Sequence, residues 1–549
     1  MKRRIHISIL VLSLAFFGAC DYLDYDESSY LLEDQVFSDF GRTKQFLTGI
    51  YAYLPDGFNP IDGAMRSSAT DDAIHVWKNS NIHKFNDGSW SAVQPLDNVY
   101  GTMYRGIRAA NKFLVETEGQ TFEDQKYNED YGDQMKQFRL YPFEARFLRA
   151  YFYFELAKRY GSLPLVTETL SPEEANAVSP VPFDTIVQFI VNECDVIADS
   201  LPSSFHQLPN GETGRATKGA AMALKARALL YAASTLHNEA GTSEKWASAA
   251  EAAYDVIYLG IYELEGNYKD LFNNPLSAEL ILGRRESESN TFERNNFPVG
   301  YEGGNTGTCP TQNLVDAYEM QGSGLAIYMD GSGYDPNFPY LNRDPRLNET
   351  ILKNGDAWKG KNIETWYGGA NAQPKPNASL TGYYIKKYVI ESINLTPTNT
   401  TQKNHTWILF RYAEILLNYA EAMNELYGPE DPATYGISAV EAVNAVRSRA
   451  GMPDFPAGMS KDEFRLKLRN ERRVELAFED HRFWDIRRWE IGKQTTDIYG
   501  VVITENVFGG LVYSKTLIEN RLYEDRMNLY PIPESELFIN SNLSQNTGW

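Results

Sequence analysis

The sequence predicts a mainly α-helical protein in which paired helices form a scaffold beside a long loop-rich region. Apolar residues recur at three- and four-residue spacing over 97–260 and again over 406–490, which is the pattern of amphipathic helices. Between these segments, residues 261–405 lose the periodicity and are rich in Gly, Asn, Pro and Tyr. A loop-rich segment of this length inside a folded chain is uncommon unless it carries a function.

The scaffold prediction rests on helices that follow one another closely. Residues 131–160 indicate one long helix that ends at Gly161, a residue type that often follows a helix C-terminus. Residues 215–237 carry many alanines at three- and four-residue spacing, which lets neighbouring helices approach closely. Stacked helical hairpins of this kind resemble tetratricopeptide repeats (TPR), with an irregular period. An isolated helical pattern over 31–54 and a second loop-rich segment over 55–95 precede them.

The most unusual stretch is Arg469–Trp489, which holds six arginines and five acids among large apolar residues. On one continuous helix, a single stripe would contain Phe464, Leu468, Glu471, Glu475, Phe478 and Arg482. Charges that share a face with core residues are tolerated only when they are paired. A catalytic cluster is one interpretation. A structural network of buried ion pairs is favoured, because acid–base catalysis needs two carboxylates in a cleft with divergent pKa values.

Composition narrows the class of protein. With 549 residues and 43% hydrophobic content, the chain can bury a large core, and we expect residues 31–549 to form one domain. The formal net charge of −21 argues against nucleic acid as a partner. Aromatic residues make up 13% of the chain, more than a core usually needs, which leaves some for a binding surface.

The N-terminus predicts export and a lipid anchor. Lys2, Arg3 and Arg4 precede an apolar run, and the segment ends in Gly18-Ala19-Cys20. Residues 1–19 are therefore a predicted signal peptide, and Cys20 is the predicted lipidation site of a bacterial lipobox. Residues 20–30 form an acidic tether. No later stretch approaches the 18 apolar residues of a membrane span, so the acyl chains would be the membrane attachment.

Cysteine and histidine usage predicts no metal site and no cofactor. The three cysteines have no metal-binding spacing, and the seven histidines are scattered. Cys194 lies in an apolar helical pattern and is expected to be buried, while the sequence leaves a pairing with Cys309 open. Asp330 and Asp335 do not have the spacing of an EF-hand, and whether calcium assists is left open.

Tryptophans in polar, turn-rich segments are candidates for ligand contact. An exposed indole can stack on the apolar face of a sugar ring while nearby polar groups bind the hydroxyls. For any single tryptophan, packing into its own core is an equal alternative. The aromatic candidates of the two loop-rich segments are Trp77, Trp90, Tyr301, Trp358 and Trp366.

A series of motifs along the chain resembles one known family. After Cys20-DYLD come TDDA, EARFLRAYFYFELAKRYGSLPLV, GRATKGAAMALKARALLYAA, PTQNLVDAY, RDPRL, FRYAEILLNYAEAMNE, AVNAVRSRAGMP, RNERRVELAFEDHRFWDIRRW and LYPIPESELFINSNLSQNTGW. In this order they resemble the SusD/RagB family. The resemblance implies about four TPR-like helical units packed against an irregular ligand-binding region. It also implies a surface lipoprotein of the outer membrane that captures a nutrient and covers a SusC-like, TonB-dependent transporter.

The resemblance assigns ligand residues by region. In starch-binding members an aromatic arc comes from the loops after the TDDA-like segment and from the loop-rich middle, where the five aromatic candidates lie. Surrounding polar candidates are Arg66, Asp72 and Asn305. The leading hypothesis is a glycan-binding, non-enzymatic protein that delivers its ligand to the transporter. A peptide-binding member is the alternative. A surface glycoside hydrolase is a third, although no HExxH, GxSxG or Walker motif is present.

Overall fold

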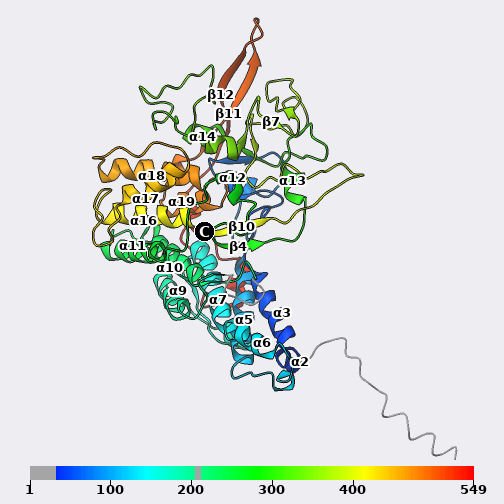
Figure 1. Cartoon of the computed structure of the whole chain (residues 1–549), viewed down its shortest axis with the longest axis vertical. Coiled ribbons are helices and arrows are strands. Elements are labelled where there is room, and N and C mark those ends of the chain that lie inside the picture. Colours follow the sequence, from blue (N-terminus) through cyan, green and yellow to red (C-terminus); the bar gives the residue numbers. More distant parts are fainter. Residues whose placement is uncertain (1–32, 205–211) are drawn as a thin grey trace, which may run out of the picture.

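The computed structural model describes residues 33–204 and 212–549, and it is mainly helical, as predicted. The predicted signal peptide, Cys20 and the acidic tether over 20–30 lie outside the described residues. Figure 1 shows the helices stacked along one side of the molecule and the loops and short strands gathered at one end. Within the described residues, no helix combines the length and the apolar character needed to cross a bilayer.

The scaffold helices form one continuous succession. They are α5 (Tyr100–Glu116), α7 (Tyr141–Tyr160), α9 (Phe183–Ala198), α10 (Lys218–Ala233), α11 (Ser243–Tyr258), α16 (Tyr412–Leu426), α17 (Ala439–Arg449) and α18 (Lys461–Glu475). Each of the first six packs on the next, and α16 then packs on both α17 and α18. Helices α11 and α16 are therefore neighbours although the loop-rich region separates them in the chain.

Local sequence explains where these helices begin and end. The side chains of Ser438 and Ser460 accept hydrogen bonds at the N-termini of α17 and α18 in complete capping boxes. Gly161 follows α7 with φ 73°, as its position in the sequence predicts. The predicted single helix over 131–160 is wrong. Two helices occupy it, α6 (Tyr131–Phe138) and α7, and Pro142 lies in the first turn of α7, where its missing N–H costs nothing.

Further helices lie outside this scaffold and are separated by loops. These are α2 (Glu33–Phe37), α3 (Phe40–Tyr51), α4 (His83–Asp87), α8 (Pro172–Ala175), α12 (Tyr268–Leu271), α13 (Thr291–Asn296), α14 (Gln312–Ala317), α15 (Arg346–Thr350), α19 (His481–Arg488) and α20 (Glu534–Ile539). The 3-10 helices are η1 (Arg66–Ala69), η2 (Glu123–Gln125), η5 (Thr235–His237), η6 (Gly492–Gln494) and η7 (Asp525–Asn528).

The described strands form two-stranded antiparallel pairs rather than one sheet. The pairs are β1 (Ala73–His75) with β5 (Thr308–Pro310), β2 (Leu163–Pro164) with β3 (Pro180–Val181), β4 (Leu280–Arg285) with β10 (Thr406–Arg411), β6 (Ile351–Leu352) with β9 (Tyr384–Ile385), β7 (Ala357–Trp358) with β8 (Lys361–Asn362), and β11 (Asp497–Glu505) with β12 (Leu511–Asn520). Cys309 lies on β5 opposite Ile74. It and Cys194 are buried, free thiols, which answers the question of their pairing.

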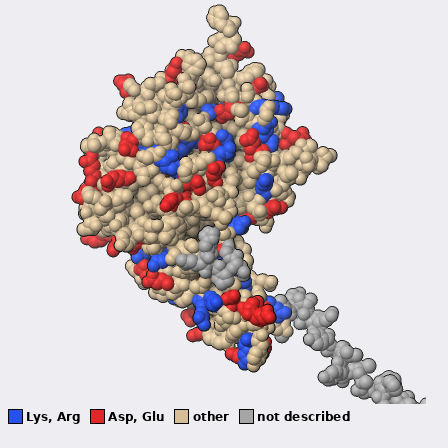
Figure 2. Space-filling view, in the orientation of Figure 1, with Lys and Arg blue, Asp and Glu red and all other residues tan. Residues whose placement is uncertain are grey.

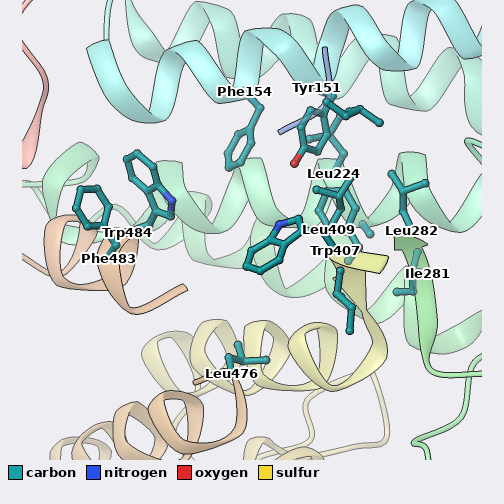
Figure 3. Close-up of a cluster of buried hydrophobic side chains, with 14 of the residues drawn as sticks. Tyr151, Phe154, Leu224, Ile281, Leu282, Trp407, Leu409, Leu476, Phe483 and Trp484 are labelled. Carbon is teal, nitrogen blue, oxygen red and sulfur yellow. The ribbon is translucent and has the colours of Figure 1, made fainter. Parts of the chain in front are cut away.

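A buried hydrophobic cluster fills the seam between the scaffold and the loop-rich region. Figure 3 shows Tyr151 and Phe154 of α7 above Leu224 of α10 and the Trp407–Leu409 segment of β10. Phe483 and Trp484 of α19 lie beside them. The seam is therefore packed from both sides, and it fixes the loop-rich region on the helices.

The stretch Arg469–Trp489 crosses this seam as two helices. Helix α18 ends at Glu475, the chain turns through Phe478 (φ 62°) and Asp480 (φ 72°), and α19 begins at His481. The expected single stripe is therefore wrong beyond Glu475. Arg482 lies on α19 and pairs with Asp71, so it does not extend the row of Glu471 and Glu475.

The predicted network of buried ion pairs is confirmed. Glu475 has no exposed surface and accepts hydrogen bonds from Arg346 (2.8 Å), Arg411 (2.7 Å) and Arg449. Burial raises the pKa of Glu475, but these arginines outweigh it and hold that pKa well below its usual range. Arg346 belongs to the loop-rich region and Arg449 to α17. Glu471 likewise pairs with Arg346 and with Arg447 of α17, so two neighbouring carboxylates of α18 join the two regions.

Candidate functional site

The candidate site begins at the two acids of the TDDA motif, which anchor strand β1. Arg473 donates to Asp72 at 2.6 Å, and Arg482 donates to both carboxylate oxygens of Asp71 at 2.9 Å. Burial raises the pKa of Asp71, but Arg473 and Arg482 hold it at about 2. Burial also raises the pKa of Asp72 above its ordinary value. The start of β1 is thereby fixed to α18 and α19.

Strand β1 delivers Trp77, whose indole is held on several sides. Its Nε1 donates to the carbonyl oxygen of Asn305 at 2.9 Å, and the ring of His75 meets it edge-on with centroids 4.8 Å apart. Gly63 has φ 85°, and a Cβ there would lie 2.5 Å from Cζ3 of Trp77, so a glycine is needed behind the ring. Burial lowers the pKa of His75 to about 4, which keeps the imidazole neutral at pH 7.

Trp77 lines an open groove of about 800 Å³. The segments that line it are 76–79, Asn305 and 373–378 with Leu380. Lys78, Asn79 and Lys375 supply hydrogen-bond donors, and Trp77, Leu380 and the prolines Pro374 and Pro376 supply apolar surface. Among the described lining residues there is no Asp or Glu, which is notable in a chain with 73 acidic residues.

The far wall of the groove is formed by residues 373–378 and Leu380, which belong to a loop over 364–381. Other parts of this loop hold it in place. Asn371 donates to the carbonyl oxygen of Val299 at 2.6 Å and accepts from the backbone N–H of Glu364 at 3.0 Å. The N–H of Tyr367 donates to the carbonyl oxygen of Ile503 on β11 at 2.8 Å. This loop is therefore positioned by the Tyr301 loop on one side and by the β11–β12 hairpin on the other.

The predicted aromatic residues separate into three groups. Trp77 lines the groove. Trp366 is half-buried beside Gly368 in the same loop as the far wall but does not line the groove, and Tyr301 is half-buried with its hydroxyl donating to the carbonyl oxygen of Trp358 at 2.9 Å. Trp90 and Trp358 are each only 2% exposed. The expectation that these two offer exposed rings is wrong.

The buried tryptophans have structural surroundings. Trp90 packs against Phe85, Tyr530 and Trp549, with ring centroids 4.4–5.1 Å apart. Trp358 meets Phe297 edge-on and borders a separate cavity of about 300 Å³. Both rings are buried because they pack against aromatic residues from distant parts of the chain. The sequence around each tryptophan does not identify those partners.

The predicted polar residues also separate. Arg66 is buried and donates to Asp97 (2.8 Å) and Asp480 (2.9 Å), so it ties η1 to the seam. Asp72 is fully buried at the foot of β1. Neither lines the groove. Asn305 is exposed and borders the groove, as expected of a residue near the ligand.

Several lining residues were not predicted from the sequence. Lys78 and Asn79 directly follow Trp77, and Lys375, Asn377 and Leu380 lie in the far wall. The run QPKPN at 373–377 was a usable signal, because alternating prolines stiffen a loop and a polar residue between them is held outward. Within the described residues, no group of His, Cys, Asp and Glu has the arrangement of a metal site.

Comparison with known proteins identifies the family. A family model described as the SusD family matches residues 279–549, and one described as starch-binding associating with outer membrane matches residues 21–230. The chain belongs to the SusD/RagB family. The two matches cover the TDDA segment, much of the loop-rich region and the scaffold helices apart from α11 and the end of α10. Both faces of the groove therefore lie in parts of the chain that the family models match.

Relatives cover almost the whole SusD-like chain. SusD-like protein P25 of Formosa agariphila is 24% identical, with 89% of this chain and 90% of that protein covered. A SusD-like protein from Bacteroides fragilis has a similar structure, with TM-score 0.78, 28% identity, and 94% and 99% of the two chains covered. A SusD-like carbohydrate binding protein, also from Bacteroides fragilis, has TM-score 0.76 and 27% identity, with 93% and 100% covered.

Proposed function

We propose that this SusD-family protein binds a glycan in the Trp77 groove without cleaving it and passes it to a SusC-like, TonB-dependent transporter of the outer membrane. The observation that carries the proposal is the fixed indole of Trp77 beside hydrogen-bond donors in an open groove. The carbohydrate-binding relative from Bacteroides fragilis and the starch-binding family description support a sugar as the ligand. The ligand-contacting residues we propose are Trp77, Lys78, Asn79, Asn305 and Lys375, with Trp366 and Tyr301 behind them.

The lining of the groove supports binding rather than hydrolysis. Most glycoside hydrolases place two carboxylates on either side of the bond that they cleave. The described lining of the groove contains neither Asp nor Glu. Prolonged incubation with oligosaccharides that bind should leave their length unchanged. Shortening of the chains that is lost in a carboxylate variant would overturn this part of the proposal.

Weak binding at one open site suits a protein that must release its ligand. Stacking and a few hydrogen bonds give modest affinity at one site. We propose that lipid-anchored molecules on the cell surface compensate by acting together. The anchor is proposed at Cys20, at the end of an export signal, and the outer-membrane description of the matching family supports that location.

Calorimetry on a panel of oligosaccharides and peptides tests the ligand class. We expect saturable binding to oligosaccharides and none to peptides. Trp77→Ala should weaken that binding roughly five- to thirtyfold, while Leu466→Ser, which removes an exposed apolar side chain from α18, should leave it unchanged. Binding to peptides alone would replace glycan by peptide. Unchanged affinity of the Trp77→Ala protein would contradict the proposal that the ligand binds in this groove.

The lipid anchor is tested separately in cells. Cys20→Ala should move the protein from the membrane fraction to the soluble fraction. Cys194→Ala is the matched control, because Cys194 is buried and free and should leave the distribution unchanged. Membrane retention of the Cys20→Ala protein would count against the anchor.

A further inference from the structure

The β11–β12 hairpin projects from the end of the molecule opposite to α2, where the described chain begins (Figure 1). Its strands pair antiparallel from Asp497–Asn520 to Glu505–Leu511. In the described chain it belongs to no larger sheet. Two strands alone have little stability in water. A long isolated hairpin therefore calls for contacts on its outer edges.

The outer edge of β11 already has such contacts. The N–H of Val501 donates to the carbonyl oxygen of Thr381 at 2.9 Å, and the carbonyl oxygen of Ile503 accepts from Tyr367. Thr381 and Tyr367 belong to the loop over 364–381 that carries the far wall of the groove, although neither lines it. The hairpin is therefore attached to the proposed ligand site through β11, and β12 is left on the outside.

The outer edge of β12 is open. Two opposite residues of an antiparallel pair either both point their backbone N–H and C=O groups inward, at each other, or both point them outward, away from the partner strand. Lys515 and Tyr513 stand opposite Val501 and Ile503, so their N–H and C=O groups face outward, as do those of Leu511 two residues away. Among the described residues, no backbone hydrogen bond from outside the hairpin reaches β12. Proteins usually block such an edge, because it can pair with another strand.

The tip of the hairpin is apolar and well formed. Val507 is 92% exposed and Phe508 is 94% exposed. The side chain of Asn506 accepts hydrogen bonds from the N–H groups of Phe508 and Gly510, both at 2.9 Å, which fixes the turn. Figure 2 shows this tip as a projection without charged side chains at its end. An ordered turn thus holds two apolar side chains away from the body.

We infer that β12 docks onto a partner protein by pairing its outer edge with an extended strand, while Val507 and Phe508 enter an apolar pocket of that partner. An extended polypeptide presents alternating N–H and C=O groups that can pair with the unpaired groups of this edge. A glycan or a lipid has no such backbone. The charged side chains of the hairpin are Asp497, Glu505 and Glu519, which are acidic, and Lys515, which is basic. The hairpin therefore has a net negative charge, and an anionic membrane surface would repel it.

The choice of partner for the test rests on the proposed function, in which an outer-membrane transporter receives the ligand. The lipoprotein is expressed in its native bacterium with an affinity-tagged transporter, and the two proteins are purified together. Phe508→Ser and Leu511→Pro should each reduce the recovered lipoprotein at least tenfold. Leu511→Pro removes one outward N–H, and proline is tolerated at such positions of edge strands.

Matched controls separate the possible failures. Leu511→Thr keeps the N–H and should retain most of the complex, and Leu466→Ser removes an exposed apolar side chain elsewhere. Purified Phe508→Ser should bind glycan as the wild type does. Full recovery of both hairpin variants overturns the docking inference and leaves the proposed function intact. If the tagged transporter recovers no wild-type lipoprotein, the proposed delivery step fails, and the inference fails with it. A concentration-dependent dimer that Phe508→Ser abolishes would assign the surface to a second copy of this chain and also overturn it.

Discussion

The seam and the groove use charged and aromatic residues in opposite ways. In the seam, Glu475 is buried and forms ion pairs with its arginines, and in the adjoining core Trp90 is enclosed by other rings. In the groove, Lys78 and Asn79 are exposed, and Trp77 keeps part of its surface open. The same residue types therefore give stability in one region and line the proposed ligand site in the other. Their surroundings, rather than their identity, decide which.

The largest expected effect is in the seam. Glu475→Gln removes the charge that three buried arginines share, and it should cost roughly 3–5 kcal/mol of unfolding free energy. Urea unfolding measures this, and glycan affinity per folded molecule should stay unchanged. Asp462→Asn on the same helix is the control, because its surface ion pair is worth about 1 kcal/mol at most. A Glu475→Gln protein that is as stable as this control but unable to bind glycan would show that Arg469–Trp489 forms a ligand-binding site.

Trp90→Ala should resemble the seam variant. Truncation of a large buried aromatic side chain typically costs about 3–5 kcal/mol. The residual folded protein should bind glycan with normal affinity, because Trp90 lies outside the groove. Thermal unfolding and calorimetry on the same sample measure both quantities. A stable Trp90→Ala protein with lost binding would contradict the division between the two regions.

Acid should weaken the seam. Burial raises the pKa of Glu421, but Arg488 outweighs it and holds that pKa at about 2, and Lys158 and Arg159 hold the pKa of Glu155 at about 2. Both pKa values lie below the ordinary value of 4.5. Between about pH 2 and pH 4.5 the unfolded chain therefore binds more protons than the folded chain. Each carboxylate then loses on the order of 3 kcal/mol of stabilisation as pH falls through that window.

The buried histidines act in the same direction. Burial, with Arg472 nearby, lowers the pKa of His481 well below 6.5, so its protonation also favours unfolding as pH falls. The unfolding temperature should therefore decrease steadily from pH 6.5 downward, and more steeply below pH 4.5. A constant unfolding temperature between pH 7 and pH 3 would show that these groups are not buried and paired as described.

In the groove, Trp77→Ala should lose about 1–2 kcal/mol of binding free energy, since ring stacking accounts for only part of a weak interaction. Its stability should change much less than that of Trp90→Ala, because one side of the indole is already solvated. Comparison of the two variants by calorimetry and thermal unfolding gives the sharpest contrast between the regions. Equal losses of stability would show that Trp77 is also a core residue.

The smallest effect concerns ligand charge. Lys78 and Lys375 line the groove and no carboxylate opposes them, so an acidic oligosaccharide should bind several-fold more tightly than the same chain with its carboxylates esterified. The preference should decrease as salt is raised from 20 to 500 mM, since exposed charges are screened. Lys78→Met should reduce it, and Lys84→Met, in α4 outside the lining, should not. Tighter binding of the ester would contradict this prediction.

Periodic segments could be predicted from the sequence, and contacts between distant segments could not. The helices, the cap at Gly161 and the buried pairing of Glu471 and Glu475 follow from local spacing and from the cost of unpaired charge. The break before Pro142 has a local cause, a proline in the first turn of a helix, whereas the turn at Phe478 depends on which elements pack nearby. Of the predicted site residues, Trp77 and Asn305 reached the groove, whereas Trp90 and Trp358 were enclosed by rings far away in the chain.

The hairpin was missed for a different reason. Its strands contain several β-branched residues on both sides of the turn-forming run Asn506–Gly510, which is a hairpin signal, but these residues do not alternate regularly with polar ones. Few of its side chains are buried, so the usual alternation of apolar and polar residues is blurred. An exposed hairpin is therefore the kind of element for which hydrophobic patterning carries least information.

The adjacency of α11 and α16 has a consequence for the order of folding. Ala249, Ala253 and Val256 of α11 are buried in the finished scaffold, yet α16 follows only after about 150 further residues. Closing a loop of that length costs about 4 kcal/mol of chain entropy if the intervening chain is disordered. Prior folding of the loop-rich region would shorten the effective loop. The second half of the scaffold is therefore expected to form late, after the region that carries the groove.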